Sequence, residues 1–237
     1  GRFDLAYTMR SSSFRAVAEV SLGWVSARLR QDMPVPEVLS PLPFSITDLR
    51  LAPDPLSHLP DLNLHPDTRF WWEVDCPSEI PGEDRLRIQP CHTLVIGSIP
   101  PDRSSLTAVL LASQPQRVVL FGHIPPTSTL RNVLTRLGGL IRFIQLNRNN
   151  KTMLDELSAA CAASNAAVRF GLEWWQAKGS IKVAWLEDGL VEVKPADRPN
   201  PADLSVIESK LEQVLAEIAA FRMHYLRAPV NSLLRIQ

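Results

Sequence analysis

Two short apolar segments constrain the fold of this chain more than any other feature. Thr93–Gly97 (TLVIG) and Arg117–Gly122 (RVVLFG) are continuous and rich in β-branched and aliphatic residues. Such runs are typical of strands buried on both faces, as in a parallel sheet. Between them, Leu106, Val109 and Leu110 recur at helical spacing. The order predicts a right-handed βαβ unit, and with it an α/β fold class built on a small open parallel sheet.

Both segments end in the same way, with Gly, one further residue and Ile-Pro-Pro. Proline has no N–H, so these pairs cannot continue a sheet ladder, and their fixed φ suits the start of a helix. We expect Asp102 or Ser104 to cap the first following helix, and Thr127 or Ser128 to cap the second. A phosphate-binding loop needs glycines and free N–H groups at these positions. The joints therefore indicate a scaffold rather than a pair of ligand loops.

The first half of the chain divides by composition into three parts. Residues 1–31 predict two β-strands, because apolar and polar residues alternate on either side of a serine-rich turn. Residues 32–44 hold four prolines and predict a linker. Residues 45–126 contain the βαβ unit and predict the α/β domain.

The second half is mostly helical. Residues 127–196 predict three helices and a two-stranded wing that turns at Asp188-Gly189, which is the element order of a winged helix-turn-helix. Residues 197–237 predict a long helix packed on the body, with Arg222 and Arg227 as late bases that suit its dipole. Its apolar residues alternate three and four apart, which favours a face buried in its own domain over a dimer seam: Leu204, Ile207, Leu211, Val214, Ile218, Phe221 and Tyr225.

Composition indicates a protein of a reducing compartment. The 237 residues are 45% hydrophobic and have a formal net charge of zero. The charge is uneven, because residues 32–92 hold four Arg against eleven acids while both flanks are mildly basic. The chain has no apolar run of membrane-spanning length and no signal peptide, and three cysteines at unrelated spacings argue against disulfides. We expect a cytoplasmic protein without membrane contact.

The sequence starts within a strand pattern and without Met, which suggests part of a longer protein.

Motifs for catalysis or metal binding do not stand out. The sequence has no glycine-rich phosphate loop and no Cys-x-x-Cys pair, and its histidines lack metal-binding spacing. The carboxylates between residues 73 and 84 favour a solvated loop over an acidic metal site. A small α/β enzyme is one alternative, because Ser98 and His123 lie where an open α/β sheet places ligands. Otherwise we expect no catalytic residue, metal ligand or cofactor in this chain.

The N-terminal strands are the first candidate for nucleic-acid contact. Single-strand binders stack bases on aromatic side chains and track phosphates with cations. The strands and their turn combine both kinds of residue: Arg10, Phe14, Arg15, Trp24 and Arg28. The alternative interpretation is that Phe14 and Trp24 belong to a hydrophobic core.

The winged region is the second candidate. The outer face of its last helix carries a weakly positive set of side chains: Arg169, Glu173, Gln176 and Lys178. Helices that read duplex sequence present more cations and amides, so the pattern disfavours duplex readout. A winged-helix DNA-binding regulator with an α/β sensing domain stays an alternative. Phe170 and Trp174 lie four apart, off the core face, and either pack against the α/β domain or anchor a protein partner.

Residues 3–30, FDLAYTMRSSSFRAVAEVSLGWVSARLR, resemble the last two strands of the OB-type domain in bacterial RecJ-type single-stranded-DNA-specific exonucleases, of the DHH phosphoesterase superfamily. The family turn is often written N-x-x-x-G, and here Ser11–Ser13 replace the Asn and Ala16 replaces the Gly. The segments HTLVIGSIPPDRSSL, RVVLFGHIPP, EWWQAKGSIKVAWLEDGLVEV and FRMHYLRAPVNSLL look like the C-terminal domain of the longer family members.

The resemblance implies the non-catalytic C-terminal region of a RecJ-like 5′→3′ exonuclease, acting in DNA repair and recombination. The family's Asp-His-His motif, its other aspartate motifs and its Gly-Gly-His motif do not occur here. Manganese or magnesium hydrolysis would therefore belong to a missing catalytic part. We expect a monomer in which Phe170 and Trp174 dock DNA-repair proteins. Contact with single-stranded DNA would fall to the OB-type strands, at Arg10, Phe14, Arg15 and Arg28.

Overall fold

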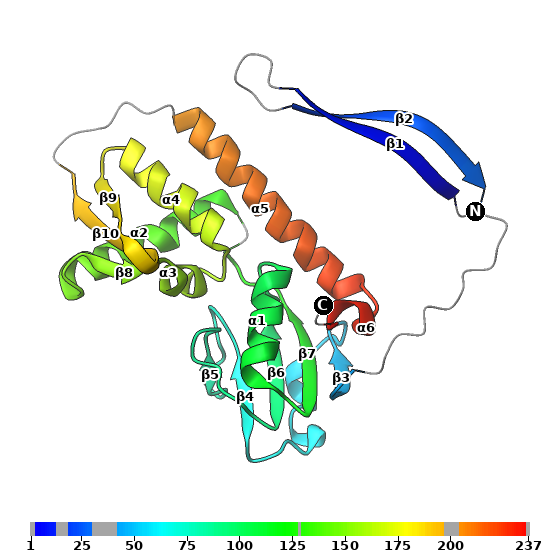
Figure 1. Ribbon diagram of the computed structural model, residues 1–237. Helices are drawn as coiled ribbons and strands as arrows, with labels where there is room; N and C mark the ends of the chain where they lie inside the picture. The colour runs from blue at the N-terminus through cyan, green and yellow to red at the C-terminus, as the bar shows by residue number, and fades with distance from the viewer. Residues whose placement is uncertain (1–2, 13–18, 30–41, 128, 197–203, 236–237) are drawn as a thin grey trace. The chain divides into compact units, whose positions relative to one another are not determined.

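The computed structural model of the protein divides into two compact units, Gly1–Pro41 and Leu42–Gln237 (Figure 1). It describes residues 3–12, 19–29, 42–127, 129–196 and 204–235. The first unit contains the predicted pair of strands. The second contains the sheet, the helices and the wing.

The first unit is an antiparallel hairpin of β1 (Phe3–Ser12) and β2 (Glu19–Leu29). Its register shifts after Ala6, which places Tyr7 directly opposite Trp24. Residues that pair across two strands share one face of the sheet. Both aromatic side chains are exposed in this hairpin, at 62% for Tyr7 and 68% for Trp24. The prediction of two N-terminal strands is confirmed.

The second unit is built on a parallel sheet. Among the described residues, five strands lie in the order β3-β7-β6-β4-β5: β3 (Ser45–Leu49), β4 (Thr68–Trp71), β5 (Gly82–Glu83), β6 (Thr93–Ser98) and β7 (Arg117–His123). Every neighbouring pair is parallel. Helix α1 (Arg103–Ser113) connects β6 to β7, which confirms the predicted βαβ unit.

The side chains of β6 and β7 alternate between two hydrophobic cores. One core packs under α1 and includes Tyr225 near the end of the chain. The other packs against Trp72 and the region of two short 3₁₀ helices, η2 (Pro55–His58) and η3 (Pro60–Leu62). Burial on both faces explains why the two strands are continuous apolar runs in the sequence.

The helical region has the predicted winged order, with one additional short strand. Its elements are α2 (Leu130–Asn147), β8 (Lys151–Met153), α3 (Leu154–Ala160), α4 (Asn165–Ala177), β9 (Ile181–Trp185) and β10 (Leu190–Pro195). The strands form an antiparallel sheet in the order β8-β10-β9. The wing turns where predicted, through η4 (Glu187–Gly189), and Asp188 and Gly189 have positive φ angles of 55° and 76°.

The two strand-to-helix joints are capped differently. Asp102 caps α1 through its side chain, as predicted. Helix α2 is capped by Thr129 rather than by Thr127. The prediction of Thr127 was wrong because its hydroxyl is buried and donates a hydrogen bond to the Cys161 carbonyl at 2.6 Å. Ser128, the other candidate, lies outside the described residues.

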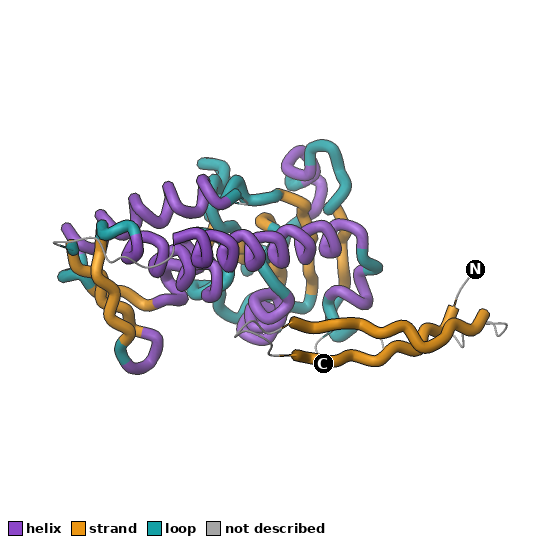
Figure 2. Tube along the Cα trace, turned by 90° about the horizontal axis from the view of Figure 1, so that it is seen from above, coloured by secondary structure: helices purple, strands orange, loops and turns teal. Residues whose placement is uncertain are grey.

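Helix α5 (Leu204–Arg227) runs beside both the helical region and the sheet of the second unit, and the short helix α6 (Val230–Leu233) follows it (Figure 2). None of the described helices has the length and apolarity to cross a membrane. The predicted packing of α5 on its own domain is confirmed, because one side of it is buried: Leu211, Leu215, Ile218, Arg222 and Tyr225.

Arg222 departs from the sequence prediction. It was expected to be a late base that suits the dipole of α5, but it is only 2% exposed. Its Nη2 donates a hydrogen bond to the Ala162 carbonyl, in the turn before α4, at 2.6 Å. The helix dipole therefore does not explain this residue, which lies in the interior of the unit.

Candidate functional site

The predicted single-strand-binding residues are only partly described. Phe14 and Arg15 lie outside the described residues. Arg10 belongs to β1, where its backbone pairs with Ser21. Arg28 is exposed on β2. An aromatic pair that the sequence did not single out as a unit, Tyr7 and Trp24, is the described feature of this hairpin best suited to base stacking.

The strand-end residues Ser98 and His123 are neighbours across β6 and β7. Ser98 is 2% exposed, its Oγ accepts a hydrogen bond from the Glu73 N–H at 3.0 Å, and it donates to the Glu73 carbonyl at 2.9 Å. The ring of His123 lies 5.2 Å from that of Trp72, and burial lowers the pKa of His123. The Ser98 hydroxyl is thus engaged in a strand-end hydrogen-bond pair, which does not suit a nucleophile.

The carboxylates between residues 73 and 84 do not all lie on a solvated loop. Glu73 is buried at the end of β4, where Arg85 binds both of its oxygens at 2.6 Å and the Trp71 indole donates a third bond at 3.0 Å. That part of the prediction was wrong because Glu73, two residues after β4, is buried and paired with Arg85. Among the described residues, no group of three or more His, Cys, Asp or Glu side chains could hold a metal ion.

The outer face of α4 is occupied by contacts within the protein. Arg169 lies 3.4 Å from Glu173 and 5.0 Å from the centre of the Trp185 ring on the wing. Gln176 accepts a hydrogen bond from the Val183 N–H at 2.7 Å. Side chains that make these contacts within the protein are poorly placed to contact the base edges of a DNA duplex.

The two predicted partner-binding residues have different surroundings in the structure. Phe170 is half-buried and packs against the core of the helical region. Trp174 is half-buried as well, and its Nε1 donates a hydrogen bond to Glu208 Oε1 on α5 at 2.8 Å. Both therefore pack against the core of the helical region, and the alternative in which they pack against the α/β domain was wrong.

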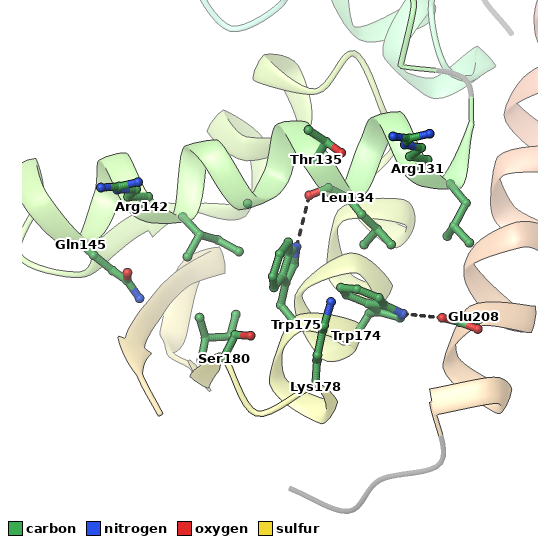
Figure 3. Close-up of a pocket in the computed structure, with 14 residues that line it drawn as sticks. Arg131, Leu134, Thr135, Arg142, Gln145, Trp174, Trp175, Lys178, Ser180 and Glu208 are labelled. Atoms are coloured by element: carbon green, nitrogen blue, oxygen red, sulfur yellow. Dashed lines mark hydrogen bonds between the residues drawn. The ribbon is translucent and has the colours of Figure 1, made fainter. Parts of the chain in front are cut away.

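Trp174 lines an open pocket of about 780 Å³ between α2, α4, the start of β9 and α5 (Figure 3). We call it the α2–α4 groove. Its apolar lining comes from two neighbouring indoles and from the facing side of α2: Leu130, Leu134, Gly138, Ile141, Trp174 and Trp175, with Ile181 at the start of β9.

Trp175 reaches the groove because of a glycine on α2. A Cβ atom added at Gly138 would lie 2.7 Å from the Trp175 ring, so a larger residue would push the indole aside. Trp175 Nε1 donates a hydrogen bond to the Leu134 carbonyl at 3.3 Å, and its ring meets that of Trp174 edge to face at 5.2 Å. Adjacent glycines weaken a helix, yet α2 is one continuous helix, and Gly138 is the position against which Trp175 packs.

The charged residues that line the groove are mostly basic. Arg131 and Arg142 are exposed on α2, and within the described part of the chain neither has a carboxylate partner. Lys178 Nζ lies 4.7 Å from the centre of the Trp174 ring and 5.6 Å from that of Trp175. Glu208 is the acid of this lining, and its Oε1 is bonded to Trp174.

Sequence reasoning missed most of this site. It singled out Trp174 and Lys178 but not Trp175, Arg131 or Arg142. The sequence held one signal for Arg131 and Arg142. Residues eleven apart in a helix lie on the same face, three turns apart. Glu208 carried no such signal, since only the packing of α5 brings it to Trp174.

Comparisons with known proteins found no relative. No protein-family model, curated protein or solved structure matches this chain.

Proposed function

We propose that this chain is the non-catalytic C-terminal region of a RecJ-like 5′→3′ single-stranded-DNA exonuclease, which binds single strands and docks partner proteins in DNA repair and recombination. The α2–α4 groove is the observation that carries the docking half of this proposal. The exposed pair of Tyr7 and Trp24 supports the single-strand half. Hydrolysis, with manganese or magnesium, would belong to a catalytic part outside this chain.

The chemistry of the groove fits a short acidic segment with an apolar anchor. Indoles and aliphatic side chains offer an anchor the large contact area that dominates binding energy in many interfaces. Arg131, Arg142 and Lys178 would pair with carboxylates around that anchor, and charge-assisted hydrogen bonds of this kind are among the stronger ones. Nucleic acid fits this site less well, since the rim is short and carries an acid.

The length of the groove sets the length of the segment. Arg131 and Arg142 are eleven residues apart on α2, which corresponds to about 16 Å along a helix. An extended peptide covers this distance with about five residues. A linear motif is therefore a better fit than a folded partner surface.

The test uses the whole chain and a labelled peptide probe. The probe is N-acetylated Asp-Asp-Leu-Phe-Leu-Asn amide, and its comparison has Asn in place of both Asp residues. We expect fluorescence polarisation to show binding of the acidic probe that weakens with salt, and about fivefold weaker binding by Arg142→Gln. Arg227→Gln, an exposed cation at the end of α5, is the matched control. Equal binding of both peptides, or an equal loss in the control, would reject the docking proposal.

A further inference from the structure

Glu208 makes the α2–α4 groove electrically asymmetric. Figure 3 shows Glu208 and Arg131 toward one end of the groove and Arg142 and Gln145 toward the other. Lys178 lies between the ends, over the two indole rings. The end near α5 therefore holds one cation, Arg131, and one acid, Glu208. The far end holds a cation and a neutral amide.

The Glu208 carboxylate is held in place. The Trp174 indole donates to its Oε1 at 2.8 Å, and Trp174 itself packs edge to face on Trp175. Glu208 is half-buried against this aromatic surface, where charges interact more strongly than in bulk water. A fixed, partly desolvated carboxylate repels a second carboxylate and attracts an ammonium or an amide.

We infer that Glu208 selects peptides whose acids lie at only one end. This inference rests on the proposed docking function and deepens it. The acidic end of the peptide pairs with Arg142 and Lys178, the apolar residues fill the centre, and the end beside α5 carries a lysine, an arginine or an amide. A segment that is acidic at both ends places one carboxylate against Glu208 and binds less well than its net charge suggests.

Two capped peptides test this selection, Asp-Asp-Leu-Phe-Leu-Lys and Asp-Asp-Leu-Phe-Leu-Asp. The comparison does not depend on the direction in which the backbone lies, because the second peptide is acidic at both ends. The measured quantity is the ratio of the two dissociation constants for the wild type and for Glu208→Gln, which keeps an acceptor for the Trp174 indole. Tryptophan emission, compared with that of the wild type, checks that the six indoles, Trp174 among them, keep their surroundings. Glu217→Gln removes the same charge from an exposed position on α5, outside the groove.

We expect Glu208→Gln to shift the ratio about fivefold toward the doubly acidic peptide, a size typical of partly exposed charge pairs, and Glu217→Gln to leave it unchanged. An unchanged ratio in Glu208→Gln, or the same shift in Glu217→Gln, overturns the selection by Glu208 but leaves docking intact. If the wild type binds neither peptide, the docking function fails, and this inference fails with it.

Discussion

Arg50, directly after β3, donates a hydrogen bond to the backbone carbonyl of Tyr225 on α5, 175 residues later in the chain. It donates a second bond to the Ala228 carbonyl at 3.1 Å, and Asp48 binds the other side of the guanidinium at 2.8 Å. The last carbonyls of a helix have no partner within the helix. Arg50 therefore satisfies the end of α5 and ties this helix to the sheet.

Arg50→Met should lower the free energy of unfolding by about 2–4 kcal/mol, because it leaves the carbonyls of Tyr225 and Ala228 without their side-chain donor and the Asp48 carboxylate without the guanidinium. Urea unfolding followed by circular dichroism measures the change. Arg69→Met is the control, since Arg69 pairs with Glu83 at 2.7 Å in a more exposed position and should cost under about 1 kcal/mol. Equal losses in the two variants would mean that Arg50 does not tie α5 to the sheet.

The Arg50 hydrogen bond also predicts a pH dependence. It holds the pKa of the Asp48 carboxyl below its ordinary value. A carboxylate of this kind contributes stability above its unfolded pKa, about 3.9, and that stability is lost as the pH falls through the lower folded pKa. Asp48→Asn should therefore destabilise the protein at pH 7, by under about 1 kcal/mol for this partly exposed side chain, and have a smaller effect near pH 3. A constant difference across this range, or the same pattern in the exposed Asp61→Asn, would contradict the assignment.

Two adjacent glycines on α2 provide a matched test of the groove. Gly138→Ala places a Cβ atom 2.7 Å from the Trp175 ring, so it should displace the indole, change tryptophan emission and weaken peptide binding. Gly139→Ala meets no atom within 4 Å and should stabilise the helix by about 0.5–1 kcal/mol. Thermal unfolding and the polarisation assay separate the two effects. If Gly138→Ala also stabilises the protein and leaves binding intact, Trp175 is not a fixed wall of the groove.

Arg222 is a buried cation that its surroundings satisfy only in part. Within the described residues its Nε and Nη1 have no hydrogen-bond partner, and burial lowers its pKa to about 10. Because the folded pKa lies below the unfolded one, the charge costs stability throughout the range below pH 10. Arg222→Met should leave stability unchanged or raise it by up to about 4 kcal/mol in urea unfolding. If Arg222→Met instead loses more than about 2 kcal/mol of stability while the control Arg227→Met changes little, Arg222 makes contacts that compensate for its burial.

The sheet was predictable because its signals are local. Strands β6 and β7 are buried on both faces, so their sequences are continuous apolar runs, and Asp102 stands directly before the helix that it caps. Thr127 does not cap α2, because its hydroxyl donates a hydrogen bond to the distant carbonyl of Cys161. The three-residue strand β8 was missed because its pairing with β10 cannot be read from so short a segment.

The groove was not predictable, because its parts come from separate elements. The bond between Trp174 and Glu208 spans 34 residues and exists only once α5 has packed on α4. Helical periodicity alone cannot distinguish a core residue from a pocket wall, so it could not assign Trp175 to the groove. Arg222 shows the same limit, because its position near the end of α5 suits the helix dipole, whereas the fold buries it.

The hairpin should bind single-stranded DNA through Trp24, whose exposed ring faces Tyr7 across the strands. Stacking is worth about 1–3 kcal/mol per base, so Trp24→Ala should weaken binding of an oligothymidine at least fivefold without changing its salt dependence. Arg28→Gln should instead reduce the slope of log affinity against log salt by about 0.7, the value for one phosphate contact on a single strand. Both are measured by polarisation over a salt series. If Trp24 is a core residue, Trp24→Ala will unfold the hairpin and abolish its circular dichroism signal, whereas a stacking residue will lose affinity alone.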